Sequence, residues 1–251
     1  MRIAVLSDIH GNLHALDAVL ADLRLQAPDL VVDLGDSLSG PLRPAETADR
    51  LAGLDPVAIR GNHERQMLTL GIDEMNASDS RTWPRLASRH RERLRALPAT
   101  RSVADGAVLL CHGSPDDDLC YLMEEITADG TVVPAAPATV AARLGAAADH
   151  AVVLCGHTHL PRQLRLPDGG LVVNPGSVGL PAYRDDRPRP HVVETGSPHA
   201  RYALVEQDGA GGWRARFRTI AYDWQRSAGE ARAAGRPDWA HALATGRAPA
   251  A

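Results

Sequence analysis

Five short segments of the chain carry side chains of the types that bind metal ions, and turn glycines or apolar runs bound each of them. They are Asp8-Ile9-His10, Gly35-Asp36, Gly61-Asn62-His63-Glu64, Cys111-His112-Gly113 and Gly156-His157-Thr158-His159. Carboxylate oxygen, amide oxygen and imidazole nitrogen suit Mn, Fe, Zn, Co or Ni. Two such ions about 3.5–4 Å apart can hold both the attacking and the leaving oxygen of a phosphoryl transfer. The pattern therefore predicts a two-metal centre that hydrolyses phosphate esters.

The predicted ligands divide between two metal positions that share one carboxylate. The first position is assigned Asp8, His10, Asp36 and His159, and the second Asp36, Asn62, His112 and His157. Asp36 follows Gly35, whose missing side chain lets backbone approach closely. Asp8 and His10 are two residues apart on a loop that we expect to be extended, so both side chains point the same way. Two divalent cations and two carboxylates leave a charge of about +2, which suits a hydroxide and a phosphodiester anion.

His63 is left outside both predicted ligand sets. We predict that it stabilises the pentacoordinate transition state or protonates the leaving oxygen. The expected nucleophile is a hydroxide that bridges the two metals, because the metals lower its pKa towards neutrality. His63 and Asp36 are thus the predicted catalytic residues, and no covalent intermediate is needed.

Hydrophobic spacing predicts the elements that must hold these residues. Short apolar runs predict buried strands over residues 3–6, 30–34 and 57–59. Apolar residues three and four positions apart predict helices over residues 13–25 and 44–54. Strands that alternate with helices in this way indicate a parallel sheet with helices on its faces.

Each motif begins just beyond the predicted end of a strand. Two further buried strands are expected over residues 108–111 and 152–155, with a helix over residues 140–148 before the second. The motifs of His112 and His157 follow these two strands, as the other three motifs follow the first three. Because open α/β sheets bind ligands at the carboxyl edge of their strands, we expect all five motifs to meet there.

The pattern changes to that of antiparallel strands in the C-terminal part of the chain. Strands joined by glycine-rich turns are expected over residues 162–166, 171–173, 201–205 and 213–220. We interpret them as an antiparallel second sheet with edges that could pair with another copy, although the sequence leaves the oligomeric state open.

We expect one domain over residues 1–222. Residues 64–98 are expected to be helical and residues 114–136 irregular, within a lid region over residues 64–136. Residues 223–251 are rich in Ala and Arg, and we expect a C-terminal helix or tail there.

Composition narrows the function. A chain of 251 residues has ample length for a buried core. All 27 basic residues are arginines, so a lysine Schiff base and a phosphate-loop lysine are both excluded. The net charge of -4 argues against a stable nucleic-acid partner. Three cysteines without a CxxC pair indicate reduced thiols and a cytoplasmic location.

Neither a signal peptide nor a membrane span is expected. The apolar run at residues 3–6 is shorter than the core of a signal peptide. No stretch approaches the roughly 20 apolar residues that cross a bilayer, so we expect no membrane partner.

The motifs, in this order, resemble the signature of the calcineurin-like metallophosphoesterases. The resemblance extends over residues 1 to about 180 and fills every signature position at Asp8, His10, Asp36, Asn62, His63, His112, His157 and His159. Asn174-Pro175-Gly176-Ser177 after a hairpin is similar to the small bacterial and archaeal phosphodiesterase branch. The resemblance implies an α/β fold, a four-layer αββα sandwich of two mixed β-sheets flanked by helices. It also implies a dinuclear centre and hydrolysis of phosphoesters.

Our first hypothesis is a cytoplasmic phosphodiesterase with two divalent transition metal ions that acts on a small organic phosphate ester. A nucleotide or a dinucleoside polyphosphate belongs to that class. The first alternative is a phosphomonoester or protein phosphatase, which needs an open groove where the sequence predicts a lid. The second is a non-catalytic binding scaffold, which is expected to have lost ligands and His63 in particular. The sequence leaves the physiological substrate and the metal identity open.

Several residues near the motifs have structural explanations. We interpret Glu64 as a helix-start acid that favours the helix dipole, and His14 as structural or a support for the ligands. Asn174 and Ser177 are expected to hold a turn beneath the site. Cys111 and Cys155 are expected to point away from it, into the core.

The sequence leaves the roles of one basic segment and of two tyrosines open. The segment from Arg81 to Arg101 holds seven arginines and one acid. It is either a surface face that is solvated or paired with Asp116 to Asp118, or a cationic lid that draws in polyphosphate. Tyr121 and Tyr183 either stack on a base or pack within the fold.

Overall fold

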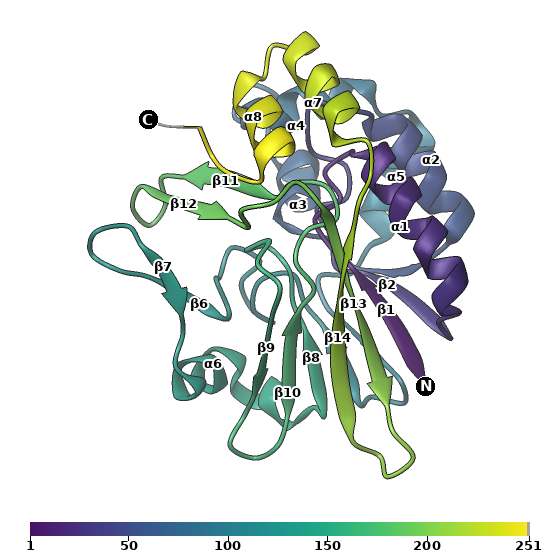
Figure 1. The fold of residues 1–251 in the computed structure, drawn as a ribbon, viewed down its shortest axis with the longest axis vertical. Helices are drawn as coiled ribbons and strands as arrows, with labels where there is room; N and C mark the ends of the chain where they lie inside the picture. Colours follow the sequence, from purple (N-terminus) through teal and green to yellow (C-terminus); the bar gives the residue numbers. More distant parts are fainter. Residues whose placement is uncertain (250–251) are drawn as a thin grey trace.

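Two five-stranded β-sheets pack against each other at the centre of the molecule, whose residues 1–249 are described by a computed structural model (Figure 1). The first sheet consists of β1 (Arg2–Leu6), β2 (Leu30–Asp33), β3 (Val57–Ala58), β13 (Ala200–Gln207) and β14 (Trp213–Ile220). Its strand order is β14-β13-β1-β2-β3. Strand β1 is parallel to β2 and antiparallel to β13, so the sheet is mixed.

The second sheet is mixed as well. It consists of β4 (Arg101–Val103), β5 (Val108–Leu110), β8 (Val152–Leu154), β9 (Arg162–Arg165) and β10 (Leu171–Asn174). The strand order is β4-β5-β8-β10-β9, with β8 parallel to both β5 and β10. The strands that precede His112 and His157 are therefore neighbours, which brings these two motifs together.

Alternation along the strands separates two apolar layers. Ile3 and Val5 of β1 face the second sheet and pack in one cluster with Leu110 and Leu154. Ala4 and Leu6 of the same strand belong to the cluster on the opposite face. Burial of each Ile, Val or Leu side chain contributes about 1.5–3 kcal/mol, so the layer between the sheets fixes their relative position.

Helices cover both outer faces. The first sheet is covered by α1 (Leu13–Gln26), α2 (Pro44–Leu54) and α5 (Ser88–Ala96), whose buried residues share one cluster with Leu204 of β13. The second sheet is covered by α6 (Pro137–Leu144), through Val140 and Leu144 against Val153. These layers confirm the predicted four-layer sandwich. The helix predicted over residues 140–148 begins earlier, at Pro137, and ends in the 3₁₀ segment Gly145–Asp149.

The prediction of an antiparallel second sheet was wrong. The two predicted pairs are antiparallel, but β9–β10 lies in the second sheet whereas β13–β14 extends the first. Strand β10 also pairs with β8 in parallel, and β13 pairs with β1. Alternation within a strand specifies a buried face, not which sheet supplies the partner, so the sequence pattern could not separate these cases.

The region predicted to be irregular over residues 114–136 contains a hairpin. It is formed by β6 (Glu124–Ile126) and β7 (Val132–Pro134). A second hairpin that the sequence pattern did not reveal is formed by β11 (Ala182–Asp185) and β12 (His191–Glu194). Strands of three or four residues are too short to establish an alternation, and prolines and charges at their ends obscure it.

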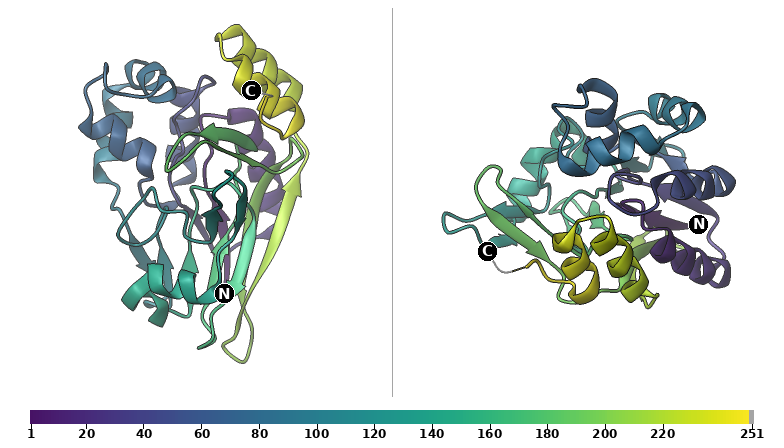
Figure 2. Two further views of the ribbon diagram at one scale, coloured as in Figure 1. Left: turned by 90° about the vertical axis from the view of Figure 1, so that its left-hand side faces the viewer. Right: turned by 90° about the horizontal axis from the view of Figure 1, so that it is seen from above.

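The predicted C-terminal helix or tail is a pair of packed helices, α7 (Trp224–Ala233) and α8 (Pro237–Thr245). Trp239 and Leu243 of α8 are buried against Leu180 and Ala182. Figures 1 and 2 show both helices at the same end of the molecule as α3 (Asn62–Thr69) and α4 (Ala77–Thr82). Residues 250–251 of the predicted segment lie outside the described residues.

Within residues 1–249, none of the helices combines the length and the apolar composition that a membrane span requires.

Candidate metal centre

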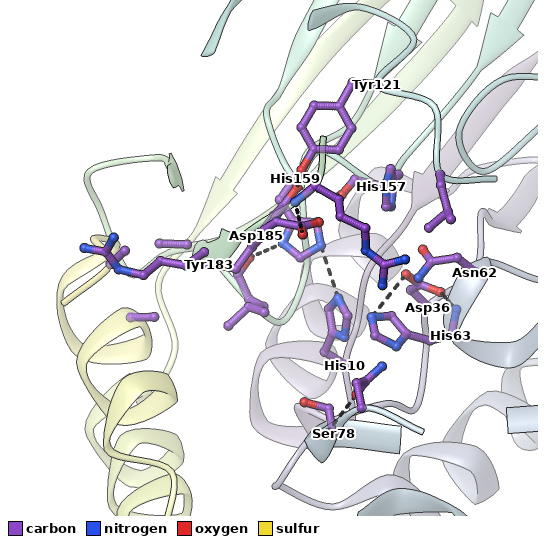
Figure 3. A pocket seen from close by; sticks show the side chains of 18 of the residues that line it. His10, Asp36, Asn62, His63, Ser78, Tyr121, His157, His159, Tyr183 and Asp185 are labelled. Carbon is purple, nitrogen blue, oxygen red and sulfur yellow. Dashed lines mark hydrogen bonds and ion pairs between the residues drawn. The ribbon is translucent and has the colours of Figure 1, made fainter. Parts of the chain in front are cut away.

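The five motifs meet at one end of the two sheets, beyond the carboxyl ends of β1, β2, β3, β5 and β8. Backbone hydrogen bonds join the loops there. Asp8 N donates to Gly35 O at 3.0 Å, His10 N to Asp36 O at 3.0 Å, and Gly156 N to His112 O at 2.7 Å. The side chains of His10, Asp36, Asn62, His157 and His159 converge on one cavity wall (Figure 3). The loops therefore carry the polar side chains as one unit.

Two groups of side chains within this unit have the arrangement of metal sites. The first group is Asp8, His10 and His159, and the second is Asp36, His112 and His157, with the facing atoms of each group within 4.8 Å of one another. Asn62 joins the second group, because its side-chain oxygen lies 3.0 Å from His112 Nε2. The structure thus brings together every predicted ligand. The two groups are those predicted from the sequence, except that Asp36 belongs to the second group alone rather than to both.

Hydrogen bonds to backbone carbonyls fix the orientation of three of the imidazoles. The Nδ1–H groups of His10, His112 and His159 donate to Ser39 O at 2.8 Å, Leu34 O at 2.8 Å and Leu180 O at 2.7 Å. A carbonyl only accepts, so Nδ1 carries the proton and Nε2 faces inward. The Nε2 atoms of His10 and His159 lie only 3.1 Å apart. Two lone pairs at this distance need a cation between them, either a proton or a metal ion.

Each carboxylate has one oxygen held by the protein and one oxygen turned to the centre. Asp8 Oδ2 accepts from Ser7 Oγ at 2.6 Å and from His157 N at 3.2 Å, whereas the fully buried Oδ1 has no hydrogen-bond partner. Asp36 Oδ1 accepts from His63 N at 2.9 Å, and its Oδ2 lies 3.0 Å from His112 Nε2. An orphaned buried carboxylate oxygen is costly unless a cation binds it. The donor set therefore fits a pair of divalent metal ions.

Ionisation in the metal-free protein agrees with this fit. Burial lowers the pKa of His10 to about 3 and that of His157 to about 4, so both are neutral near pH 7, as metal ligands must be. Burial opposes protonation of His112, but the Asp36 carboxylate outweighs it and raises the pKa of His112 to about 10. A proton on His112 therefore balances Asp36 until a metal ion replaces it.

The side-chain amide of Asn62 lies among the second group of predicted ligands. Its Oδ1 lies 3.0 Å from His112 Nε2. Because His112 is protonated in the metal-free protein, its Nε2–H can donate to this oxygen as well as to Asp36 Oδ2. The same orientation would present the oxygen to a metal ion.

The ligand loops have an unusual backbone. Asp8, His10, Asp36, His157 and His159 all have positive φ angles, between 51° and 67°. The expectation that Asp8 and His10 lie on an extended loop was therefore wrong. Each left-handed residue costs about 1–2 kcal/mol, although Asp and His tolerate this region better than most residues. The hydrogen bonds between the loops offset that strain.

Two glycines allow the ligand loops to approach each other closely, and one buried acid joins these loops by hydrogen bonds. A Cβ atom on Gly35 would overlap the backbone of Gly61, and one on Gly61 would overlap the Asp36 carboxylate. Glu64 is fully buried and accepts from Asp36 N at 2.7 Å, Ser37 N at 2.9 Å and Gly61 N at 2.8 Å. Glu64 is structural, as expected, but it acts by joining two ligand loops rather than only at the helix start.

Asp79 is a residue of the site that the sequence analysis missed. It is fully buried on α4, and its Oδ1 accepts from His63 Nδ1 at 2.8 Å and from Ser39 Oγ at 2.6 Å. Its Oδ2 accepts from Asn76 Nδ2 at 2.7 Å. Asn76 also accepts from the backbone N–H groups of Ser78 and Asp79, so the Asn76-x-x-Asp79 spacing has a local explanation as a helix cap. Asp79 turns His63 Nε2 towards the centre, 3.9 Å from Asp36 Oδ2.

The supporting residues lie where the sequence predicted them. Asn174 Nδ2 donates to Gly156 O at 2.8 Å and Ser177 Oγ to Asp8 O at 2.7 Å, so both hold ligand loops from beneath. Cys111 and Cys155 are buried in the cluster beneath α6, away from the centre. His14 lies 3.0 Å from Glu230 Oε1 and ties α1 to α7.

The basic segment does not reach the centre. Arg89 pairs with Asp49 of α2 at 2.8 Å and Arg93 with Asp55, just after α2, at 3.0 Å, whereas Asp118 pairs with Arg65. Of the described residues that line the main cavity, none belongs to residues 81–101. Of the two interpretations, the structure therefore favours the surface face over the cationic lid.

Comparisons with known proteins agree with this fold. A family model described as the calcineurin-like phosphoesterase superfamily domain matches residues 1–196. The metallophosphoesterase from Sphaerobacter thermophilus has a similar structure, with a TM-score of 0.73 and 27% identity over 98% of this chain and 99% of its own. A hypothetical protein from Pyrococcus horikoshii OT3 shares the fold, with a TM-score of 0.72 and 22% identity over 98% of each chain.

The match to a curated protein is local. It is 38% identical over 66 residues to an uncharacterized protein of Methanocaldococcus jannaschii, and it covers 26% of this chain and 27% of that protein.

Mn²⁺ added to metal-stripped protein should raise its melting temperature, because the cation removes the repulsion between His10, His159 and Asp8. A ligand at 100 times its Kd that binds only the folded state contributes about 2.7 kcal/mol. For a chain of this size the shift is roughly 5–10 °C, measurable by scanning calorimetry. Asp8→Asn should reduce the shift and the exposed control His241→Ala should keep it. An unchanged melting temperature at saturating Mn²⁺ would contradict the fit.

Gly156→Ala should lower both the melting temperature and the affinity for Mn²⁺. The added Cβ would overlap Ser7 Oγ and lie 3.0 Å from Asp8 Oδ2, which displaces a predicted ligand. Gly229→Ala in α7 is the matched control, because no atom lies within 4 Å of its added Cβ. It should stabilise the protein by about 0.5–1 kcal/mol. Parental stability and Mn²⁺ affinity in Gly156→Ala would disprove the close approach.

Proposed function

The chain belongs to the calcineurin-like phosphoesterase superfamily, and on that premise we propose that it is a phosphodiesterase with two divalent metal ions. The coarser function, hydrolysis of phosphate esters by a metal-binding protein, follows from the family and from the two clusters of ligand atoms. The finer proposal concerns the diester substrate and the roles of individual residues.

One observation carries the proposal. Three imidazoles are fixed by carbonyl acceptors so that their Nε2 atoms face the same small space as Asp8 Oδ1, which has no partner, and Asp36 Oδ2. Asn62 and His157 complete the second set of donors. Divalent ions held by these residues would supply Lewis acidity, which would polarise a phosphoryl group and activate water as the nucleophile. We propose Asp36 as the carboxylate shared by both ions.

His63 is the proposed catalytic residue outside the ligand sets. Its side chain is partly exposed and lines the cavity, in contrast to the buried His10 and His112. In the metal-free protein, burial disfavours its charged form, but the carboxylates of Asp36 and Asp79 outweigh burial and raise the pKa of His63 to about 9. Asp79 holds Nδ1, which leaves Nε2–H to donate a proton to the leaving oxygen. Asp79 is thus a positioning residue.

The cavity favours a diester over a protein substrate. It has a volume of about 910 Å³, near the upper end of the range for sites that enclose small organic ligands. Its walls come from α4, the β11–β12 hairpin and α8, besides the ligand loops. A phosphomonoester phosphatase needs less room, and a protein phosphatase needs a groove that is open along its length. A cavity of about 910 Å³ has room for organic groups in addition to the phosphate.

Mn²⁺-titrated enzyme should hydrolyse bis-p-nitrophenyl phosphate well above p-nitrophenyl phosphate, by about tenfold or more in kcat/KM. The two negative charges of a monoester would be attracted more strongly by the metal ions. However, a monoester has only one organic group and would leave part of the cavity unfilled. Release of p-nitrophenolate measures both rates. A preference for the monoester would contradict the phosphodiesterase proposal and support a phosphomonoester phosphatase. Two bound metals without turnover of either ester would support the binding scaffold instead.

His63→Ala should bind Mn²⁺ as the parent does and lose about 10²–10⁴-fold in kcat, the range for a general acid. Asp79→Asn should lose about 10–100-fold, since it keeps the shape but not the charge that orients the imidazole. The loss should be larger for a diester with an alkyl leaving group than for p-nitrophenolate, which leaves without a proton.

Matched controls separate these effects from general damage. Asp73→Asn changes an exposed acid shortly before α4, and His241→Ala an exposed histidine, so both should retain parental kcat. An equal loss with both leaving groups would assign His63 to stabilisation of the transition state. Parental turnover by His63→Ala would reject its catalytic role.

A further inference from the structure

The cavity continues beyond the metal centre into an outer chamber. We define the outer chamber as the part lined by the β11–β12 hairpin, the segment Leu119–Ile126 and α8. Figure 1 shows the hairpin between α8 and the β6–β7 hairpin, and both neighbours contact it. α8 and the rest of the chain after residue 196 lie beyond the matched family region. The chamber is therefore built from α8, beyond the matched region, together with elements inside it.

Aromatic contacts fix the chamber to the metal centre. The Tyr183 ring packs edge-on against His159, with ring centroids 4.8 Å apart, and the Tyr121 ring against His157 at 5.2 Å. The hydroxyl groups of the two tyrosines are hydrogen-bonded at 2.7 Å, and Tyr121 is also bonded to His191 of β12 at 2.9 Å. The tyrosines therefore belong to the fold rather than to a free base-stacking platform. The hairpin is held in place before any ligand binds.

The α8 side of the chamber is fixed in the same way. The Trp239 ring lies edge-on to His10, with centroids 5.8 Å apart, and a Cβ atom on Gly40 would come within 2.8 Å of it. Arg236 lies over the same indole at 5.5 Å and donates to Ser78 Oγ of α4 at 3.0 Å. An apolar wall thus stands directly beside the first group of metal ligands.

Most charges that line the chamber are already paired. Arg143 donates to three backbone carbonyls, of Tyr121, Leu122 and Glu124. Arg236 pairs with Asp238 at 2.6 Å, and Glu124 pairs with Arg162 at 2.8 Å. Arg184 is bonded to the carbonyl of Pro249. These groups shape the walls but offer little free charge to a ligand.

Arg187, in the turn between β11 and β12, is different. Its backbone N–H donates to Asp185 Oδ1 at 3.0 Å, which fixes the base of the side chain. Its guanidinium forms no hydrogen bond or ion pair with any of residues 1–249, yet the residue lines the cavity. A guanidinium binds phosphate through a planar pair of N–H donors. Arg187 therefore offers an unpaired positive charge suited to an anion, next to Asp185, whose carboxylate accepts the backbone N–H of Arg187.

We propose that the outer chamber binds the organic part of a phosphodiester that carries a second phosphate, and that Arg187 binds this second phosphate. The inference rests on the proposed function, because it takes the metal centre as the place of the scissile phosphate. Trp239 and the neighbouring apolar wall cover the ring of the organic group. The substrate class is a nucleotide-like diester with a terminal phosphate, and Arg187 is a specificity-determining residue that takes no part in the chemical step.

Equilibrium binding tests the inference without turnover. Thymidine 3′,5′-bisphosphate and thymidine 5′-monophosphate differ only in the second phosphate, and calorimetric titration of both into Mn²⁺-loaded protein measures its contribution. The parent should bind the bisphosphate about tenfold or more tightly, as expected for one charge-assisted contact. Arg187→Gln should abolish the difference. Arg189→Gln is the matched control, because Arg189 lies on the same turn but outside the cavity lining, and it should keep the difference.

Steady-state kinetics then tests whether Arg187 also contributes to binding of a substrate that carries the second phosphate. The p-nitrophenyl esters of the two thymidine nucleotides share the scissile bond. Arg187→Gln should raise KM about tenfold for the ester with the 3′-phosphate, with kcat unchanged, and should leave KM for the other ester unchanged.

The outcomes distinguish this inference from the proposed function. Equal binding of the two nucleotides by the parent, or a retained difference in Arg187→Gln, would overturn the role of Arg187 even if diesters are hydrolysed. Selective binding of the bisphosphate without hydrolysis of any diester would support the chamber but reject the phosphodiesterase. A loss of selectivity in Arg189→Gln as well would show a diffuse charge effect and would also overturn the assignment.

Discussion

The convergence of inward-facing acceptor atoms on one small space is the constraint on which the rest of the structure depends. The Nε2 atoms of His10 and His159 lie 3.1 Å apart, and the free oxygen of Asp8 lies 3.3 Å from His159 Nε2. Backbone carbonyls hold the imidazoles in this arrangement, so the side chains cannot turn away without losing buried hydrogen bonds. The fold therefore holds acceptor atoms that repel one another close together, on loops with left-handed backbone. This arrangement fits a metal-binding site.

The sandwich makes that arrangement possible. The parallel strands of both sheets end at the same side, and the apolar layer between the sheets fixes the distance between their loops. Glu64 joins the loops of the first sheet, and the bond from Gly156 N to His112 O joins those of the second. Because each loop is held by another loop, a methyl group at Gly61 or Gly156 would move a predicted ligand.

The sequence was sufficient to predict which side chains meet at the centre, because these depend on local patterns, whereas the four layers were implied by the resemblance to the calcineurin-like family. A ligand motif follows directly after an apolar strand, and the strand ends of a parallel sheet meet at one edge. Asp79 could not be found in this way, since its contact with His63 joins α4 to the start of α3 while its spacing from Asn76 reads as a helix cap. The outer chamber could likewise not be predicted from the sequence. Its residues Tyr121, Tyr183 and Trp239 contact the predicted ligand histidines only through tertiary packing. Those contacts make the tyrosines and α8 part of the support of the centre.

The most direct test of the central claim is anomalous diffraction at the manganese edge from crystals grown with Mn²⁺. The account predicts two anomalous peaks about 3.5–4 Å apart. One should lie among Asp8, His10 and His159, and the other among Asn62, His112 and His157, with Asp36 between them. A single peak, or peaks away from these side chains, would contradict a two-metal centre.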